Sequence, residues 1–305
     1  MLLLEGKTLS DSILNSLPAR VGAATARLGR PPSLAIINYF KNSPSSVYAA
    51  KKAAACAKYG IAANLFSPDG AAGYAGFARL LADLGRDASC DAIMIERPLP
   101  DGFETLETWD SVPASKDVDG LSSLNLGRLL VTKNFSEIER GAFFTPCTAL
   151  AVIRLLRHHR IDLRGKTVAL AGRSAVVGKP LAQMLIMLDA TVTVCHTKTP
   201  DLPGIFRRSD IIISATGNAR WIKKEMISPG AVLIDVGTNF DERGKMCGDA
   251  DFDDIKDLAG AVSPVPGGVG PVTLACLLEA AVAAAEARAS SGNDHNTEKG
   301  ASVLT

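Results

Sequence analysis

The sequence predicts an α/β protein built from two domains, each with a parallel sheet, and three observations support this fold class. Apolar runs rich in β-branched residues alternate with helical patterns along most of the chain, which is typical of a parallel sheet covered by helices. The alternation restarts after a helical segment, PCTALAVIRLLRHHR, at 146–160. A length of 305 residues, of which 47% are hydrophobic, suits two domains with sizeable cores.

The first half begins with apolar residues at helical spacing from Leu9 to Leu28, where Gly29 is the stop and Pro18 is expected to kink the helix. The run SLAIINYF then predicts a buried strand, and an alanine-rich helix follows it. Two further strands, with a helix between them, complete this half. The predicted ranges are 33–40 (strand), 45–61 (helix), 62–67 (strand), 72–84 (helix) and 91–100 (strand).

The second half has four clearer strand candidates, because each apolar run ends in glycine or a polar residue. An apolar helix lies between the first two, which is the pattern of a Rossmann-type domain. The glycine- and proline-rich stretch SPVPGGVGPVT leads to a final helix, and the polar tail from Ser290 is expected to be mobile. The predicted strands are 166–172, 191–196, 210–217 and 231–237.

Composition restricts the classes of partner and the compartment. Lys plus Arg total 33 and Asp plus Glu total 32, so the net charge of +1 gives no reason to expect nucleic acid or an anionic membrane as a partner. The N-terminus, MLLLEGKTLSDS, resembles neither a signal peptide nor a membrane span. No metal site is predicted, since the four histidines form no ligand pattern. Six scattered cysteines without a CxxC pair predict reduced thiols in the cytoplasm: Cys56, Cys90, Cys147, Cys195, Cys247 and Cys276.

A candidate nucleotide site follows the first strand of the second half. The sequence GRSAVVGKP places Gly172, Ser174 and Gly178 at a turn from a strand into a helix. In a dinucleotide fold, this turn brings backbone N–H groups and the helix N-terminus against the pyrophosphate. The usual GxGxxG spacing is absent, so an ordinary strand-to-helix turn that needs glycine is the alternative.

The end of the second strand indicates which dinucleotide binds. An NAD enzyme tends to place Asp or Glu about 20 residues beyond the glycine turn, where it holds a ribose hydroxyl. Here the strand ends CHTKT, with Thr197 and Lys198 in place of an acid, and Arg173 lies in the first turn. Cations without a carboxylate suit a phosphate at that hydroxyl, which predicts NADP. The alternative is that Lys198 is a solvated surface charge.

Four motifs of the chain, taken in order, identify a family. The segment SSVYAAKK puts Tyr48 and Lys52 four residues apart on one helix face, and IERPLP follows a strand. KDVDG, which contains Asp119, lies in a loop, and PVPGGVGP is rich in glycine. Each motif alone is weak evidence. Together, and with GRSAVVGKP, ATVTVCHTKT, IDVGTN and GDADF in the second half, they resemble the methylenetetrahydrofolate dehydrogenase/cyclohydrolase family over nearly the whole chain.

The resemblance implies a fold and two activities. It implies a folate-binding catalytic domain of residues 1–147 with 273–305, a Rossmann-type NADP-binding domain of residues 148–272, a cleft between them, and a homodimer. The implied reactions are the NADP-dependent oxidation of 5,10-methylenetetrahydrofolate to 5,10-methenyltetrahydrofolate and its hydrolysis to 10-formyltetrahydrofolate. Hydride transfer needs position and electrostatics, whereas hydrolysis needs a group that activates water.

The resemblance also assigns residues. Tyr48 is similar to the aromatic residue that stacks on the pterin, Lys52 to the catalytic lysine, and Asp119 to the carboxylate that grips the pterin's amino edge. Ser45 matches a position beside the site, and Pro264, Gly267 and Gly268 are expected to line the cleft. The residues expected to contact NADP are Gly172, Arg173, Ser174, Val177, Gly178, His196, Thr197, Lys198, Thr216, Gly217 and Thr238.

One departure from the family pattern bears on the chemistry. Glu96 stands where the family has a Gln that sits with the lysine, and Arg97 replaces the Leu that follows. A carboxylate beside Lys52 favours the ammonium form and opposes its use as a base, which predicts weakened hydrolysis. The alternative is that Glu96 is protonated and acts like Gln. The other departures, Ala149, Ala151 and Thr238, are modest changes in packing.

Three other functions are compatible with parts of this sequence. A cyclohydrolase without dehydrogenase activity would not need the GRSAVVGKP and CHTKT segments. A protein that only senses folate or nucleotide would not need both Lys52 and Asp119. A dehydrogenase with a non-folate substrate, such as an amino-acid or shikimate dehydrogenase, would not need KDVDG beside the Tyr48 and Lys52 pair.

Overall fold

The computed structural model describes residues 1–41, 43–68 and 70–297, which fold as two compact units. The six-stranded unit contains Met1–Ser12 and Leu126–Cys276, and the three-stranded unit contains Ile13–Asn125 and the chain from Leu277 on. The predicted domains, 1–147 with 273–305 and 148–272, differ from these units mainly because residues 1–12 and 126–147 fold with the larger sheet. The N-terminus joins that sheet through backbone pairing.

The three-stranded unit has a parallel sheet in the order β3-β2-β4. Its strands are β2 (Ser33–Ile37), β3 (Ala62–Phe66) and β4 (Ala92–Ile95), which confirms the three strands predicted here. Every residue of the central strand β2 and of its neighbour β4 is buried, as expected for a parallel sheet whose faces are covered by helices. The predicted helices correspond to α1 (Lys7–Leu28), α2 (Pro44–Lys58) and α3 (Gly73–Arg86).

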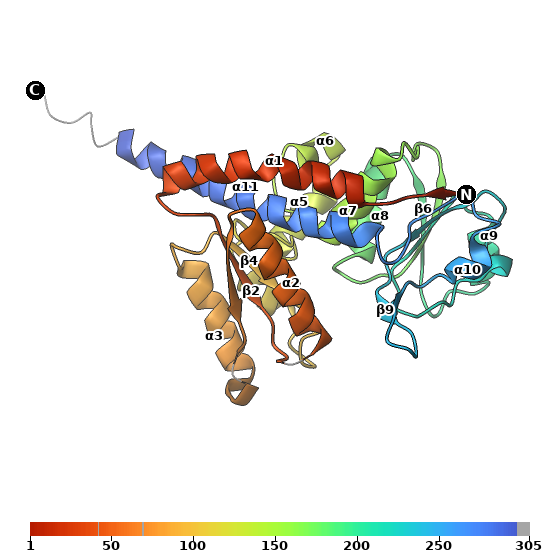
Figure 1. Cartoon of the computed structure of the whole chain (residues 1–305), viewed down its shortest axis with the longest axis horizontal. Helices are drawn as coiled ribbons and strands as arrows, with labels where there is room; N and C mark the ends of the chain where they lie inside the picture. The colour runs from red at the N-terminus through yellow and green to blue at the C-terminus, as the bar shows by residue number, and fades with distance from the viewer. Residues whose placement is uncertain (42, 69, 298–305) are drawn as a thin grey trace, which may run out of the picture. The chain divides into compact units, whose positions relative to one another are not determined.

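Helix α1 continues through Pro18, and it lies beside the C-terminal helix α11 (Val269–Thr297), as Figure 1 shows. Arg20 of α1 links the two helices, with its guanidinium 2.7 Å from the Glu286 carboxylate and 3.7 Å from that of Glu279. Helix α11 extends beyond Ser290, so the predicted polar tail begins later than expected. The last residues of the predicted tail, 298–305, lie outside the described part of the chain.

The six-stranded unit has an all-parallel sheet in the order β1-β11-β8-β7-β5-β6, which is a Rossmann arrangement extended at one edge. Four of its strands confirm the predicted ones: β5 (Thr167–Ala171), β6 (Thr191–Cys195), β7 (Ile211–Ser214) and β8 (Val232–Asp235). Two more, β1 (Leu2–Leu3) and β11 (Ala261–Val262), were not predicted, since two residues are too short to show a pattern. An antiparallel hairpin, β9 (Asn239–Phe240) with β10 (Met246–Cys247), follows β8.

Helices cover this sheet and connect it to the rest of the chain. α7 (Cys147–His158), α8 (Gly178–Met187) and α9 (Leu202–Arg207) precede or alternate with its strands, and α10 (Phe252–Ile255) leads to β11. Three short helices that the sequence did not reveal lie between β4 and α7: α4 (Leu106–Asp110), α5 (Ser123–Val131) and α6 (Phe135–Glu139). Two 3-10 turns lie elsewhere, at Gly70–Ala72 and Lys224–Met226.

Each unit has its own core. In the three-stranded unit, Ile37 and Ile95 of the sheet pack with Phe77 and Leu81 of α3. In the six-stranded unit, Ala169 and Ile212 of the sheet pack with Phe206 of α9 and Ile255 of α10. All six cysteines are buried thiols that form no disulfide in the described part of the chain.

Among the described residues, one helix is long and apolar enough to span a membrane by length and composition alone, Val269–Ser290 in α11. Its apolarity has another explanation, because 56% of this window is buried inside the protein. Val272, Leu278 and Val282 are fully buried side chains of this helix. Helix α11 is therefore a core helix in this structure.

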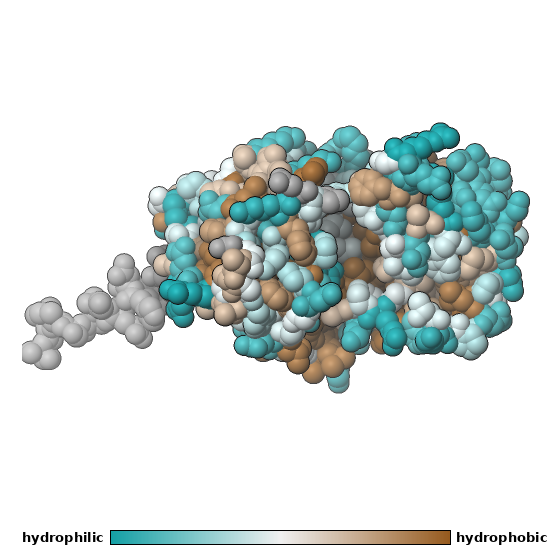
Figure 2. All heavy atoms as spheres, turned by 90° about the horizontal axis from the view of Figure 1, so that it is seen from below, coloured by the Kyte–Doolittle hydropathy of each residue, from teal (hydrophilic) through white to brown (hydrophobic). Residues whose placement is uncertain are grey.

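The surface carries exposed hydrophobic side chains among hydrophilic ones, and Figure 2 shows a face on which the two kinds are intermixed. In the six-stranded unit, Leu130 and Val131 at the end of α5 are exposed, as is Ile186 of α8. The amide of Gln183 on α8 donates to the Leu130 carbonyl at 3.3 Å, so these two helix ends are adjacent. Val194 is exposed on β6, the edge strand beside α8.

Candidate active site

The structure brings Lys52 and Glu96 together in the three-stranded unit. Lys52 lies on α2, and Glu96 directly follows β4, where its N–H continues the sheet by donating to the Ile37 carbonyl at 2.8 Å. The Lys52 ammonium donates to Glu96 Oε1 at 2.6 Å. Glu96 is only 6% exposed. The departure from the family pattern is therefore a nearly buried ion pair.

The charges around Glu96 act in opposite directions. Burial is the largest cause and raises the pKa of the Glu96 carboxyl above its ordinary value, while the Lys52 ammonium lowers it. The charge of Asp119 raises that pKa further, which places Asp119 within electrostatic reach of the ion pair. Arg97 pairs instead with Glu104, at 3.6 Å, as expected if alternate strand residues face opposite ways.

Tyr48 lies one helical turn before Lys52 on α2, which confirms the shared helix. Its hydroxyl is buried and has no hydrogen-bond partner among the described residues, and burial raises the pKa of this phenol. The Lys51 ammonium lies 5.7 Å from the centre of the Tyr48 ring. A buried hydroxyl without a partner is costly, so this position fits a ligand that supplies one.

The first turn of α2 is held by polar contacts that position Ser45. Ser43 caps the helix by accepting from the N–H of Ser46, and the Ser46 hydroxyl completes a capping box. The buried Ser45 hydroxyl donates to the Asn38 side chain at 2.8 Å, and the Asn38 amide donates to the Phe40 carbonyl. Asn38 was not predicted as a site residue. A buried Asn at the end of a strand was the available signal.

The KDVDG loop is built around Asp117 and presents Asp119. The Asp117 carboxylate accepts from the N–H groups of Leu121 and Ser122, at 3.1 and 2.7 Å, and from the Asn125 amide at 3.0 Å. Asp117 is buried, whereas Asp119 is half-buried. The motif therefore divides its two acids: the first forms the loop, and the second is exposed enough to meet a ligand.

In the six-stranded unit, the turn after β5 requires glycine at two positions. Gly172 has a φ of 121°, and a Cβ there would approach the Ala215 carbonyl oxygen to 2.6 Å. A Cβ on Gly178, the first residue of α8, would collide with the Gly172 carbonyl. The Ser174 hydroxyl accepts from the N–H of Val177 at 3.2 Å, which closes the turn. The backbone segments of this turn therefore lie as close together as in a dinucleotide-binding turn.

The turn after β6 has no acid and leaves two cations available. His196 and Thr199 close it, because the His196 N–H donates to the Thr199 hydroxyl at 2.9 Å and the Lys198 N–H donates to His196 Nδ1 at 3.1 Å. Lys198 is exposed, as is Arg173 in the neighbouring turn. In the described part of the chain, neither side chain has a carboxylate partner. This charge pattern fits a phosphate group.

Thr216 and Gly217 lie just beyond β7, the strand next to β5, and Thr238 lies just beyond β8. The Thr216 hydroxyl donates to Asp249 at 2.8 Å and accepts from the Trp221 indole at 2.9 Å. It is therefore committed to the protein, while Gly217 and Thr238 are exposed. Asp249, which was not predicted, was visible in the sequence only as part of the GDADF motif.

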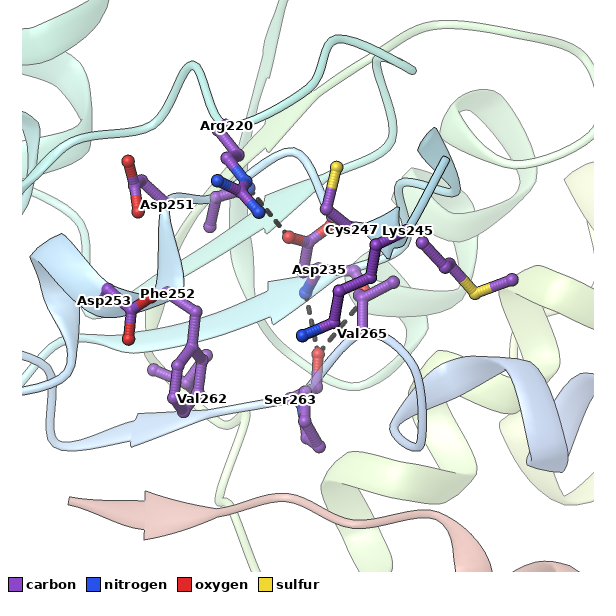
Figure 3. A pocket seen from close by; sticks show the side chains of 14 residues that line it. Arg220, Asp235, Lys245, Cys247, Asp251, Phe252, Asp253, Val262, Ser263 and Val265 are labelled. Atoms are coloured by element: carbon purple, nitrogen blue, oxygen red, sulfur yellow. Dashed lines mark hydrogen bonds between the residues drawn. The ribbon is translucent and has the colours of Figure 1, made fainter. Parts of the chain in front are cut away.

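A cavity of about 260 Å³ lies at the carboxyl ends of β8 and β11 (Figure 3). Asp235, Lys245 and Ser263 are among its lining residues, and the Ser263 hydroxyl accepts from the Asp235 N–H at 2.8 Å. Pro264 lines this cavity, whereas Gly267 and Gly268 do not. Instead, these glycines meet the N-terminus, where the Gly6 N–H donates to the Gly267 carbonyl at 2.8 Å.

Across residues 1–41, 43–68 and 70–297, no group of three or more His, Cys, Asp or Glu side chains is arranged to hold a metal ion. The prediction that the protein has no metal site stays a prediction.

Comparison with known proteins identifies relatives for both halves of the chain. The family model for the tetrahydrofolate dehydrogenase/cyclohydrolase catalytic domain matches residues 4–119, and the model for the NAD(P)-binding domain of the same family matches residues 146–289. The bifunctional protein FolD of Elusimicrobium minutum is 45% identical over 278 residues, which cover 91% of this chain and 96% of that protein.

Solved structures agree with these matches. The bifunctional FolD methylenetetrahydrofolate dehydrogenase/cyclohydrolase of Campylobacter jejuni has a TM-score of 0.86 at 37% identity, covering 94% of this chain and 99% of its own. The FolD enzyme of Trypanosoma brucei, solved with NADP cofactor and an inhibitor, has a TM-score of 0.85 at 33% identity, covering 94% and 98%. The predicted two-domain α/β fold class is confirmed.

Proposed function

Because the chain belongs to the tetrahydrofolate dehydrogenase/cyclohydrolase family, we propose that it oxidises 5,10-methylenetetrahydrofolate with NADP and hydrolyses the methenyl product to 10-formyltetrahydrofolate. The three-stranded unit binds folate and the six-stranded unit binds NADP. The observation that carries the proposal is the Lys52 amine held beside Glu96, within reach of Asp119, in a chain that also has a dinucleotide turn.

The folate site supplies groups that suit a pteridine. A flat ring system with N–H groups needs an aromatic surface and an acceptor, which Tyr48 and Asp119 provide. The Tyr48 hydroxyl gains from the ligand the hydrogen-bond partner that it lacks among the described residues. Ser45, which Asn38 holds, lies on the first turn of the same helix. Pro264, Gly267 and Gly268 remain proposed substrate-binding residues.

The nucleotide site fits NADP. NADP, when bound, accepts the hydride that leaves the substrate's methylene carbon. The backbone N–H groups of the Gly172 to Gly178 turn receive the pyrophosphate at the start of α8. Arg173 and Lys198, which have no carboxylate partner in the described structure, bind the phosphate on the ribose. Val177, His196 and Thr197 complete the part of the site that binds the ribose phosphate. Gly217, Thr238 and the backbone of Thr216 line the other half of the cofactor site.

The two activities make different demands on Lys52 and Glu96. Loss of hydride leaves positive charge on the folate, and the Glu96 carboxylate stabilises charge of that sign. Hydrolysis adds water to the methenyl carbon and releases one proton, which the Lys52 amine accepts when it is neutral. In this structure the Lys52 side chain is instead engaged by the Glu96 carboxylate at 2.6 Å. The dehydrogenase is therefore the stronger activity of this enzyme.

Burial supports one alternative for Glu96. Burial raises the pKa of Glu96 and so favours its protonated form. A protonated Glu96 would be neutral, would form no ion pair with Lys52, and would act like the Gln of the family. The two states predict different ratios of the activities, so the ratio decides between them.

A single assay tests the proposed function. The purified protein is incubated with methylenetetrahydrofolate and NADP while the absorbance of the methenyl product and of NADPH is followed. We expect NADPH to form and the methenyl product to accumulate before it decays. NADPH without accumulation would mean that hydrolysis is fast, and decay of added methenyltetrahydrofolate without any NADPH formation would indicate a cyclohydrolase alone. No reaction of folate would refute the proposal.

We also propose a homodimer in the cytoplasm, with neither nucleic acid nor membrane as a partner. The sheet edge at β6 supports the dimer, since no strand among the described residues pairs with its outer side. This strand exposes Thr193 and Val194, with Ile186 of α8 beside it. Six buried free cysteines fit a reducing compartment. Sedimentation of the purified protein tests the dimer, which a monomer at micromolar concentration would contradict.

A further inference from the structure

Two buried carboxylates lie in the six-stranded unit beyond the groups already assigned, and they have different partners. Asp235 ends β8 and accepts from backbone N–H groups, those of Gly237, Asp249 and Ala250, at 2.8 to 3.0 Å. Asp249 is fully buried, at 0% exposure, and accepts mainly from side chains. Neither carboxylate has an ion-pair partner within the described ranges. A buried carboxylate held only by neutral donors needs several of them.

The four donors to Asp249 come from two loops. Its Oδ2 atom accepts from the Ser214 hydroxyl at 2.6 Å, and from both the N–H and the hydroxyl of Thr216 at 2.8 Å. Its Oδ1 atom accepts from the Asn239 amide at 3.0 Å. Ser214 and Thr216 lie at the end of β7, whereas Asn239 begins the hairpin after β8. One side chain thus ties the ends of two neighbouring strands together.

The strand order shows why these two loops matter. β5 carries the turn for the pyrophosphate and β6 the turn for the ribose phosphate, and they occupy one side of the sheet order β8-β7-β5-β6. A dinucleotide lies across the carboxyl ends of such a sheet, so its other half extends over β7 and β8. Two exposed residues lie there: Gly217 directly follows Thr216, and Thr238 directly precedes Asn239. Thr216 and Asn239 donate hydrogen bonds to Asp249 from these two loops.

We propose that Asp249 is a positioning residue for the nicotinamide half of NADP, an inference that rests on the proposed cofactor site. Because it is fully buried, it would act through the two loops and not by contact with the cofactor or the substrate. By fixing Thr216 and Asn239 to each other, it sets the spacing between the loops that bear Gly217 and Thr238. An error of about 1 Å in such a spacing is enough to slow a transfer about a hundredfold.

The test compares Asp249→Ala with Asp249→Asn. Alanine removes every acceptor, whereas the Asn carbonyl still accepts from Ser214 and Thr216, and its amide donates to a flipped Asn239. We expect Asp249→Ala to raise KM for NADP about tenfold and to lower kcat about tenfold or more, with KM for methylenetetrahydrofolate nearly unchanged. Asp249→Asn should recover both constants to within about threefold. Emission from Trp221, which donates to Thr216, should shift in the alanine variant only.

Asp91→Ala is the matched control. Asp91 is as buried as Asp249, but it holds Arg30 and the Ser33 N–H at the amino ends of β2 and β4 in the other unit. We expect it to lower the melting temperature without changing KM for NADP. An equal rise in that KM would mean that general destabilisation explains the effect, which would overturn the inference.

A milder variant covers the case in which Asp249→Ala does not fold. Asn239→Ala removes one donor from a half-buried position and should raise KM for NADP about threefold. The role of Asp249 is refuted if KM for NADP is unchanged in whichever variant folds, or if Asp249→Asn fails to restore it. In either case, the wild-type reaction still supports the proposed function. If the wild-type protein binds no NADP, both fail.

Discussion

The candidate sites of the two units place their charges in different ways. The three-stranded unit buries an ion pair, since Lys52 meets Glu96 at 2.6 Å and Glu96 is 6% exposed. The six-stranded unit buries Asp235 and Asp249 with neutral donors only, and its cations Arg173 and Lys198 remain exposed.

The difference matches the ligand proposed for each unit. A neutral pteridine brings no charge to balance, so the charge that controls proton transfer has to belong to the protein and be paired within it. A phosphate brings its own charge, and cations that are already paired would bind it less well. The buried carboxylates of the six-stranded unit serve the frame, because backbone and hydroxyl donors satisfy them.

The largest expected effect comes from removing the cation of the buried pair. Lys52→Met, combined with Glu96→Gln so that no carboxylate is left unpaired, should lower hydrolysis of methenyltetrahydrofolate about a hundredfold to ten-thousandfold, because water loses its proton acceptor. Steady-state rates measure it. Lys58→Met on the same helix is the control, since Lys58 lies over the Tyr59 ring, 5.3 Å from its centre. Retained hydrolysis would show that Lys52 is not the base.

Asp119 should be nearly as important, but for folate alone. Asp119→Ala removes the acceptor for the pterin N–H groups and should lower kcat/KM for folate in both reactions about a hundredfold. The dissociation constant for NADP, measured by fluorescence titration, should stay within about twofold. If NADP affinity fell together with folate turnover, Asp119 would be serving the fold.

Asp235 tests what it costs to bury a carboxylate without a cation. Burial raises the pKa of Asp235 from 3.8 to about 6, so its folded-state pKa exceeds the unfolded one. Its contribution to stability is then fully present below the unfolded pKa and is lost as pH rises through about 6, by about 3 kcal/mol in total. The difference in unfolding free energy between wild type and Asp235→Asn should fall by that amount from about pH 3.5 to about pH 7. Urea titrations measure it, and a constant difference would contradict it.

Neutralising the anion of the buried pair should shift the balance of activities. Glu96→Gln removes the charge that favours the Lys52 ammonium, so hydrolysis should rise about tenfold while the dehydrogenase holds or falls. Both reactions are assayed on one preparation. Glu104→Gln is the control, because Glu104 pairs with Arg97 at 3.6 Å and should leave the ratio unchanged. An unchanged ratio in Glu96→Gln would mean that Glu96 is already protonated.

The smallest effect concerns an exposed cation. Lys198→Ala should raise KM for NADP several-fold, up to about tenfold, and leave that for NAD unchanged, because solvent weakens each charge-assisted contact. Specificity constants for both cofactors measure the preference. Lys166→Ala, directly before the amino end of β5, is the control. Equal constants for NADP and NAD in the wild type would show that the exposed cations bind no phosphate.

The sequence by itself determined the local structure and much of the site. Strand and helix alternation, the glycine turn of Gly172 and Gly178, and the helical spacing of Tyr48 and Lys52 depend on neighbours within a few residues, so a pattern reveals them. The absence of an acid after β6 is likewise visible in the sequence without knowledge of any tertiary contact. The substitution at Glu96 was visible in the same way.

Only the tertiary structure decided which polar groups meet. Lys52 and Glu96 lie 44 residues apart, Asp249 and Ser214 lie 35 apart, and the β1 residues pair with a strand near residue 261. Periodicity reports whether a residue is buried, but not which partner satisfies a buried carboxylate. That choice depends on which strand ends and loops the folded sheet brings together, which is why Asp249 and Asn38 emerged from the structure and Lys52 from the sequence.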